Sequence, residues 1–258
     1  MSFTLDKDIG HPMGLIVGGK AKKNNLISFV GKFDDEDKDE LNSTYEEIQL
    51  KQGKIQPIPD TKKEREVLYI TGQSGSGKTY FTKKYLEEYK KIYPDNPIYL
   101  FSAIPYEGEK DDYKEIKPDR IKIDEKIKDL DAKDFDNCCV VFDDMDCYKD
   151  KKVMNIVSKL RDEMLETGRH HKTTLIITYH QPTNFTDTRR IISEATAVVY
   201  FPYTATGKVR NLLENYLDLS KEQVDKLSDC GSRWVMIRKS VVPNVIITEN
   251  AMYQRNKF

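Results

Sequence analysis

Hydrophobic residues form continuous runs from residue 67 onward, whereas before it they occur in short pieces separated by glycines and lysines. Val67–Ile70 is such a run, and an unbroken apolar run is typical of a strand that is buried on both faces. The later runs predict further strands at Ile98–Phe101, Cys138–Phe142, Thr173–Thr178 and Ala197–Phe201, a weaker candidate strand at Ile121–Ile123, and a closing pair of strands at Trp234–Ile237 and Val245–Ile247.

Helical patterns alternate with these strands. The first has apolar residues at helical spacing, namely Phe81, Tyr85, Tyr89 and Ile92. A longer helix is predicted over Lys149–Thr167, where Gly168 supplies a C-terminal stop. Val209–Leu217 is a third helical stretch, and Ser220 and Gln223 have the spacing of a capping box at the start of a fourth. This alternation predicts an α/β fold with a mostly parallel central sheet and helices on both faces.

The first 60 residues predict a small β-rich module with a linker, followed by the main α/β domain over residues 61–258. Short strands are expected at Gly14–Val17 and Leu26–Val30. Between them and the main domain, Asp34–Glu40 is so acidic that it predicts a solvated loop. Glu47–Ile58 is expected to form a β-hairpin that turns at Gln52-Gly53.

Composition limits the class of protein. No purely apolar run is longer than Cys138–Phe142, which is too short to cross a bilayer, and the first residues lack a secretory pattern, so we expect an intracellular protein without a membrane partner. The net charge of -1 argues against a basic exterior that coats nucleic acid, although a ring that touches DNA through a few loops stays compatible with it.

The four cysteines, at positions 138, 139, 147 and 230, lack the paired short spacing of a zinc or redox motif. We therefore expect reduced thiols that serve as small core residues. The adjacent His170 and His171 lack a matching ligand set, so a purely metal-binding site is not expected there.

The segment that follows the first strand satisfies the Walker A pattern of phosphate-binding loops (P-loops) in full, with Gly72, Gln73, Ser74, Gly75, Ser76, Gly77, Lys78 and Thr79. The glycines allow backbone N–H groups to approach a triphosphate closely, and the helix beginning near Lys78 adds its positive dipole end. Lys78 is expected to reach the β- and γ-phosphates, and the Thr79 hydroxyl to coordinate Mg²⁺. A chance glycine-serine turn is the alternative, but the preceding strand and following helix favour ATP binding.

A P-loop requires a carboxylate at the tip of a neighbouring strand to hold magnesium. The strand Cys138–Phe142 ends in two acids, so Asp143 is the predicted metal residue and Asp144 the predicted base that orients and deprotonates the attacking water. Asp146 is an alternative base, and a solvated acidic turn is the alternative interpretation of the whole segment.

Between Lys78 and Asp143 lies the strand Ile98–Phe101, and this spacing predicts a strand inserted between the P-loop strand and the strand that ends in Asp143. Such an insertion is typical of ATP-driven motors rather than of small kinases. The strand at Thr173–Thr178 is followed by His180 and Gln181 at the edge where parallel sheets bind ligands. Gln181, or alternatively His180, is expected to contact the γ-phosphate or the water.

These segments, together with Gly168-Arg169-His170-His171 and Thr178–Pro182, occur in an order that resembles the FtsK–HerA superfamily of P-loop ATPases. The resemblance covers Glu47–Phe201 and is greatest to the poxvirus-type genome-packaging ATPases of large DNA viruses and virophages. It implies a RecA-like fold of the additional-strand type. Asp144 is a departure, because many motors of this type carry glutamate there.

The resemblance also implies a homo-oligomeric ring of five or six subunits that moves double-stranded DNA into a capsid. It implies contacts with a capsid or portal-like vertex and with a nuclease, in a virus factory of the host cytoplasm or in the virion. A neighbouring subunit would supply an arginine finger. Arg169 matches the family's segment, and Arg161, Arg189 and Arg190 are alternatives.

DNA contacts are expected from Lys208 and Arg210 or from the polar segment Lys110–Arg120, although lysines on polar loops are usually just solvated. Two other classes stay open. Another ring-forming ATPase, a helicase or a protein remodeller, has the same motifs, and a small-molecule kinase is disfavoured because no basic lid segment follows the P-loop.

Overall fold

The computed structural model describes residues 2–6, 8–19, 25–31, 44–182 and 185–258; the acidic run Asp34–Glu40 lies outside them. The described part contains a ten-stranded sheet with the spatial order β4-β14-β13-β12-β11-β6-β10-β9-β7-β8. In that order the strands are Ile48–Gln49, Ala251–Gln254, Val245–Thr248, Val235–Arg238, Ala197–Tyr200, Val67–Thr71, Thr174–Tyr179, Cys139–Asp143, Ile98–Ser102 and Asp119–Arg120.

From β11 to β8 all neighbouring strands are parallel, whereas β12, β13, β14 and β4 are added antiparallel at the other side. The expected mostly parallel α/β sheet is thus confirmed. The closing pair of strands is also confirmed as β12 and β13, while β14 was not predicted.

One strand does lie between β6 and β9, as the spacing predicts, but it is β10. The strand that the spacing argument rested on, β7, pairs with the outer side of β9 instead. Chain order alone therefore misplaced the insertion, because β10 follows β9 in the sequence. The candidate strand Ile121–Ile123 is also wrong: the short edge strand is β8, two residues earlier, and Ile121 continues it with a hydrogen bond from its N–H to the Leu100 carbonyl.

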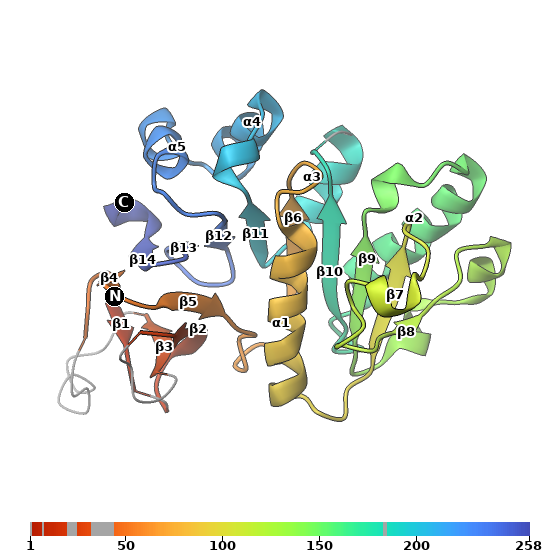
Figure 1. Ribbon diagram of the computed structural model, residues 1–258, viewed down its shortest axis with the longest axis horizontal. Coiled ribbons are helices and arrows are strands. Elements are labelled where there is room, and N and C mark those ends of the chain that lie inside the picture. The colour runs from red at the N-terminus through yellow and green to blue at the C-terminus, as the bar shows by residue number, and fades with distance from the viewer. Residues whose placement is uncertain (1, 7, 20–24, 32–43, 183–184) are drawn as a thin grey trace.

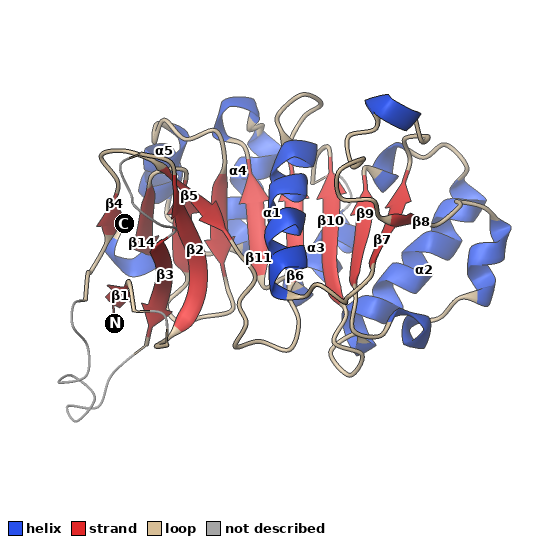
Figure 2. Ribbon diagram, turned by 60° about the horizontal axis from the view of Figure 1, so that its bottom comes forward, coloured by secondary structure: helices blue, strands red, loops and turns tan. Residues whose placement is uncertain are grey.

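Helices cover both faces of the sheet. The helices are α1 (Lys78–Ile92), α2 (Lys151–Thr167), α3 (Phe185–Glu194), α4 (Gly207–Tyr216) and α5 (Lys221–Ser228). Figure 2 shows α1 in front of β6, and α2, α3 and α4 behind the sheet. Helix α2 starts two residues later than predicted because the Asp150 side chain caps it, and the predicted capping box of Ser220 and Gln223 is present at α5. Helix α3 was not predicted.

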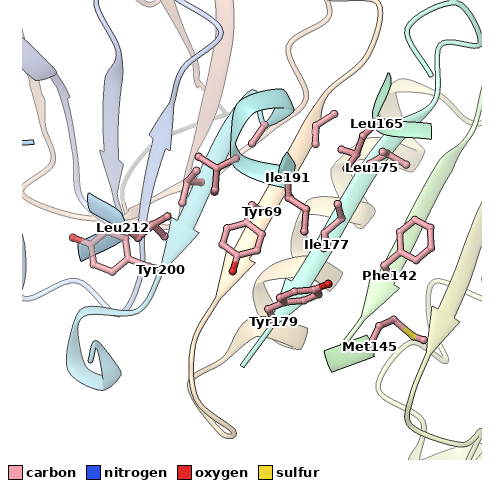
Figure 3. Packing of buried hydrophobic residues seen from close by; sticks show 14 of the residues in the cluster. Tyr69, Phe142, Met145, Leu165, Leu175, Ile177, Tyr179, Ile191, Tyr200 and Leu212 are labelled. Carbon is pink, nitrogen blue, oxygen red and sulfur yellow. The ribbon is translucent and has the colours of Figure 1, made fainter. Parts of the chain in front are cut away.

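Alternation along the buried strands sends side chains into two hydrophobic cores. Tyr69, Phe142 and Ile177 point to the side of α2 to α5, and they lie side by side because Ile177 pairs with both of the others (Figure 3). Their strand neighbours Ile70, Val141 and Ile176 point to the side of α1. Both cores continue to the ends of the strands, so residues just beyond the strands are held at a defined edge.

The N-terminal residues form a separate four-stranded antiparallel sheet. Its order is β1-β3-β2-β5, with bounds Ser2–Thr4, Asn25–Val30, His11–Val17 and Lys54–Pro57. The expected β-rich module is present and packs on the same side as α1, because Phe3, Met13 and Ile27 belong to that core (Figure 1).

The predicted hairpin over Glu47–Ile58 is wrong. The two strands exist, but β4 pairs with β14 of the large sheet and β5 pairs with β2 of the small one. The longer strand β2 supplies four partners for β5, whereas β4 has only two residues, so the segment bridges the two sheets instead of folding on itself.

Candidate nucleotide-binding site

The Walker A residues connect the end of β6 to the start of α1, at the carboxyl edge of the parallel strands (Figure 1). Gly77 has φ +108°, which an L side chain rarely adopts, and it is the N-cap of α1. A Cβ at Gly72 would lie 2.5 Å from Ser76 Oγ and 2.7 Å from Phe201 Cδ2, so only glycine fits there. The loop is therefore closely wound against its own residues and against the end of β11.

Lys78 is buried beneath this loop. Its side chain is 4% exposed, and Nζ donates a hydrogen bond of 2.9 Å to the Gly72 carbonyl. The same Nζ lies 3.4 Å from Asp144 Oδ1. The structure therefore brings the predicted phosphate-binding lysine and the predicted base together as an ion pair.

Asp143 ends β9 on the side that faces α1. Its register partner on β7 is Ser102, whose hydroxyl lies 3.4 Å from Oδ2. On the other side, Thr178 of β10 donates to Oδ1 at 3.0 Å, and Tyr113 donates to the same oxygen at 3.1 Å. Three strand ends and one loop thus fix this carboxylate.

Asp144 leaves the strand with φ +49°, in the left-handed region. Its N–H donates to Thr178 Oγ1 at 2.9 Å, which stabilises this turn. Because aspartate adopts this conformation more readily than most residues, the chain can turn the carboxylate towards Lys78. The left-handed backbone of Asp144 thus determines where its carboxylate lies.

Thr178 and Tyr113 are residues of this site that sequence reasoning did not single out. Thr178 is a fully buried hydroxyl residue at the end of an apolar strand, and such a residue needs a partner at the sheet edge. That signal was visible in the sequence. Tyr113 comes from the segment 103–118, far from Asp143 in the chain, and only the fold brings it near.

Burial dominates the electrostatics of the two acids. Desolvation and the charge of neighbouring Asp144 raise the pKa of Asp143, although the hydrogen bonds from Thr178 and Tyr113 partly oppose this shift. Burial and the Asp143 charge also raise the pKa of Tyr113 well above its usual value, so its hydroxyl remains a donor at neutral pH. The two carboxylates therefore form a buried acidic site whose negative charge a bound cation would neutralise.

The donor set fits a magnesium nucleotide. The Ser76 hydroxyl is buried and has no hydrogen-bond partner among the described residues, at the loop where phosphate oxygens would lie. Thr79 lies half-buried in the first turn of α1, and the nearby acids, Asp143 and Asp144, offer the hard oxygen ligands that Mg²⁺ prefers.

His180 and Gln181 follow β10 at the same edge. His180 Nδ1 lies 3.6 Å from Asp144 Oδ1 and 3.5 Å from Asp146 Oδ1, while its N–H donates to Asp146 Oδ2 at 3.1 Å. His180 thus lies beside both acids, and Asp144 contacts Lys78 as well. Gln181, the next residue, is half-buried at this edge.

The arginine candidates lie in different environments. Arg169 follows α2 at the amino edge of β10, opposite to the P-loop; its side chain is 76% exposed and pairs with Glu64 at 3.0 Å. Arg161 is buried and binds Asp162 and the Tyr179 hydroxyl, so it is held in the core and is unsuited to reach another subunit. Arg190 pairs with Asp162, and Arg189 is exposed.

The cysteines divide into two groups. Cys138 and Cys139 are buried in the cores, as expected. The expectation is wrong for Cys147, which is exposed and lies 3.1 Å from His180 Nδ1. It lies at the end of the short turn Met145–Cys147 that follows the two buried acids, where the chain has reached the surface. His171 pairs with Asp136, away from this edge.

Comparison with known proteins shows which proteins this chain resembles. No protein-family model matches it. It is 35% identical over 254 residues to the uncharacterised protein V3 of Sputnik virophage, which covers 97% of this chain and 98% of that protein. Among the described residues, none of the helices combines the length and apolar character needed to cross a membrane.

Solved structures share the fold at low identity. B204, the DNA-packaging ATPase of Sulfolobus turreted icosahedral virus, is 16% identical with a TM-score of 0.51, over 72% of this chain and 98% of that one. The genome-packaging NTPase B204 of Sulfolobus turreted icosahedral virus 2, in complex with ATP-gammaS, is 13% identical with a TM-score of 0.50 over the same shares. The resemblance to viral packaging ATPases is thereby confirmed, and the chain belongs to the family of the Sputnik virophage protein V3, with the P-loop ATPase fold of B204.

Proposed function

We propose that this chain is an ATP-hydrolysing motor that translocates double-stranded DNA and packages a viral genome into a capsid. The observation that carries the ATPase assignment is the buried Lys78, which lies 2.9 Å from the Gly72 carbonyl and 3.4 Å from Asp144 Oδ1. A buried lysine between a glycine-lined loop and a strand-end carboxylate is the arrangement that phosphoryl transfer requires. The DNA-packaging assignment is supported by the fold shared with B204 and by the virophage relative.

Each residue has a role that follows from its position. The loop Gly72–Thr79 points backbone N–H groups and the Lys78 charge at the phosphates. Thr79 and Asp143 would hold Mg²⁺, which when bound neutralises charge that develops on the phosphates. Asp144 orients the attacking water and accepts its proton, and Thr178 keeps this carboxylate in place through the hydrogen bond from the Asp144 N–H.

Gln181 is positioned to report hydrolysis, because it follows the strand that lies between β6 and β9. His180 is the alternative for this role, since it already lies 3.6 Å from Asp144 Oδ1.

We assign the arginine finger to Arg169 of a neighbouring subunit. Its exposed side chain lies at the edge of the sheet opposite to its own P-loop, so it can serve a site only across an interface. This assignment requires a homo-oligomeric ring, for which we propose five or six subunits.

The DNA contacts and the location follow from the same proposal. Lys208 lies at the start of α4, whereas the partner charges of Arg210 are already supplied by Glu214 and Asp225, so Lys208 is the better candidate of the two. Lys110–Arg120 is the alternative contact segment. We propose action in a virus factory or the virion, with a capsid or portal-like vertex and a nuclease as partners.

DNA-stimulated ATP turnover, combined with particle mass, tests the proposal. We expect phosphate release to rise when double-stranded DNA is added, in particles with the mass of a pentamer or hexamer. Lys78→Ala should abolish turnover, because the variant removes the buried charge that the phosphates require. Lys208→Ala serves as a matched control that keeps basal turnover but lowers the stimulation.

Each alternative class has its own outcome in this assay. Stimulation by single-stranded DNA in preference to duplex indicates a helicase. Stimulation by a protein indicates a remodeller, and turnover only with a small acceptor indicates a kinase. Any of these three results rejects the packaging motor.

A further inference from the structure

A mixed set of nitrogen, sulfur and oxygen atoms lies beside the proposed hydrolytic site. His180 Nδ1, Cys147 Sγ and a carboxylate oxygen of Asp146 all lie within 4.8 Å of one another. The Sγ to Nδ1 distance is 3.1 Å, and the Nδ1 to Asp146 Oδ1 distance is 3.5 Å. The P-loop chemistry described above uses none of these three side chains as a metal ligand.

These separations suit a tetrahedral transition-metal ion. Zinc binds thiolate at about 2.3 Å and imidazole at about 2.0 Å, so neighbouring ligand atoms in a tetrahedron lie roughly 3.3–3.7 Å apart. The ligand types favour Zn²⁺ over Mg²⁺, because magnesium prefers oxygen ligands and thiolate and imidazole are softer donors. The Sγ to Nδ1 and Nδ1 to Oδ1 distances of 3.1 Å and 3.5 Å lie within a few tenths of an ångström of this range.

Backbone hydrogen bonds hold the three ligands in this arrangement. The His180 N–H donates to Asp146 Oδ2 at 3.1 Å, which leaves Oδ1 facing the imidazole. The Cys147 N–H donates to the Asp144 carbonyl at 3.0 Å, which fixes the turn that carries the thiol. The ligands come from two segments that the parallel pairing of β9 with β10 brings together.

We propose that Asp146, Cys147 and His180 bind a Zn²⁺ ion, and that the bound ion inhibits ATP hydrolysis by withdrawing Asp144 from catalysis. Asp144 Oδ1 lies 3.6 Å from His180 Nδ1, close to the separation of two ligands on one zinc ion. This oxygen is also the partner of Lys78, so a zinc ion at the cluster competes with Lys78 for it. The inhibition rests on the proposed ATPase function; the binding of zinc does not.

Calorimetry of the full chain, freed of metal with a chelator, tests the binding. We expect one Zn²⁺ per chain in a titration with zinc chloride. Cys147→Ser should weaken the affinity by more than about tenfold, since even partners of metal ligands contribute this much. Cys230→Ser is the matched control, because Cys230 is half-buried elsewhere, and it should bind zinc as the unaltered chain does.

Cobalt substitution identifies the sulfur ligand. Co²⁺ should give a near-ultraviolet thiolate-to-cobalt absorption band in the unaltered chain and in Cys230→Ser, but not in Cys147→Ser. Equal zinc affinity in Cys147→Ser and the unaltered chain, or no zinc binding at all, overturns the site.

Turnover separates the two parts of the proposal. With excess magnesium ATP, Zn²⁺ should inhibit the unaltered chain and leave Cys147→Ser uninhibited; equal inhibition of both overturns the regulatory part. A chain that binds zinc with the expected spectrum but hydrolyses no nucleotide under any condition confirms the metal site and refutes the proposed function.

Discussion

Asp143 and Asp144 are neighbours in the chain, but their carboxylates have different surroundings. Asp143 accepts hydrogen bonds from Thr178 and Tyr113, whereas Asp144 lies against Lys78. In an extended strand, the Asp144 side chain would point to the face of the sheet opposite to that of Asp143. The left-handed backbone at Asp144 instead turns its carboxylate towards Lys78. Two adjacent acids can therefore serve separate roles.

Asp144→Asn tests the base. Asparagine tolerates the left-handed backbone as well as aspartate does, so we expect the fold and nucleotide binding to persist. The amide cannot accept the proton, and kcat should fall by about 10²–10⁴-fold, the usual contribution of a general base. Single-turnover phosphate release, with binding of a fluorescent nucleotide as the control, measures both. Turnover within about twofold of the unaltered chain would assign the base elsewhere, to Asp146 first.

Asp143→Asn tests the cost of the buried charge. Burial and the Asp144 charge raise the pKa of Asp143 in the folded chain, so its ionisation opposes folding above that pKa. In the absence of nucleotide and metal, the Asn variant should therefore have the higher Tm at pH 7.

The pH dependence follows with a defined sign. As pH falls through the raised folded pKa, Asp143 is protonated in the folded chain while it is still ionised in the unfolded chain, so the penalty shrinks between the two pKa values and disappears below the unfolded pKa. The Tm difference between the variant and the unaltered chain should shrink over that range. A Tm difference that is constant with pH would mean that ionisation of Asp143 does not destabilise the folded chain.

At the scale of elements, one arginine candidate lies within helix α2 and another lies just beyond its end. Arg161 lies inside the helix and is bound by Asp162, Asp187 and the Tyr179 hydroxyl. Arg169 lies beyond the helix end and pairs with Glu64 in solvent. The same residue type therefore has a packing role in one place and an accessible charge in the other.

Arg161→Met should destabilise the fold more than Arg169→Ala does. Arg161→Met removes the buried hydrogen-bond donor of the Tyr179 hydroxyl, whereas Asp162 keeps its pair with Arg190, so we expect a loss of about 1–3 kcal/mol in the free energy of unfolding. Arg169→Ala removes an exposed pair and should change stability by less than about 1 kcal/mol. Urea unfolding measures both.

Rings that mix variant and unaltered subunits test the assignment of Arg169 as the arginine finger. Arg169→Ala subunits should lower the turnover of rings that also contain unaltered subunits, because each variant leaves its neighbour's site incomplete. Normal turnover of a pure Arg169→Ala assembly would end this assignment and leave the exposed Arg189 as the next candidate.

At the scale of the whole molecule, a buried ion pair connects the two sheets. The Arg238 side chain is fully buried at the end of β12, where it pairs with Glu66 before β6 and donates to the Ile58 carbonyl in the linker from the small sheet. Tyr85 of α1 donates to the same carboxylate. The segment from Ile58 to Glu66, helix α1 and strand β12 thus meet at one charge pair.

Arg238→Met should lower the free energy of unfolding by about 3–5 kcal/mol, because it leaves the buried Glu66 carboxylate without its positively charged partner. The double variant Arg238→Met with Glu66→Gln removes both charges and should recover much of that loss. Denaturant unfolding of both variants and the unaltered chain measures the difference. If the double variant is no more stable than the single one, the loss arises from packing and not from the unpaired charge.

The sequence by itself determined the local features of this protein. Apolar runs fixed the strands around the P-loop, capping residues fixed α5, and the spacing of Gly72–Thr79 predicted the phosphate loop, because these signals depend on neighbours in the chain. Tertiary structure decided which strands became neighbours: β10 lies between β6 and β9, and β4 and β5 joined different sheets. Pairing between distant strands depends on which edges are left open in the assembled fold, and no local pattern encodes that. For the same reason the Tyr113–Asp143 and Cys147–His180 contacts emerged only when the strand ends were brought to one edge.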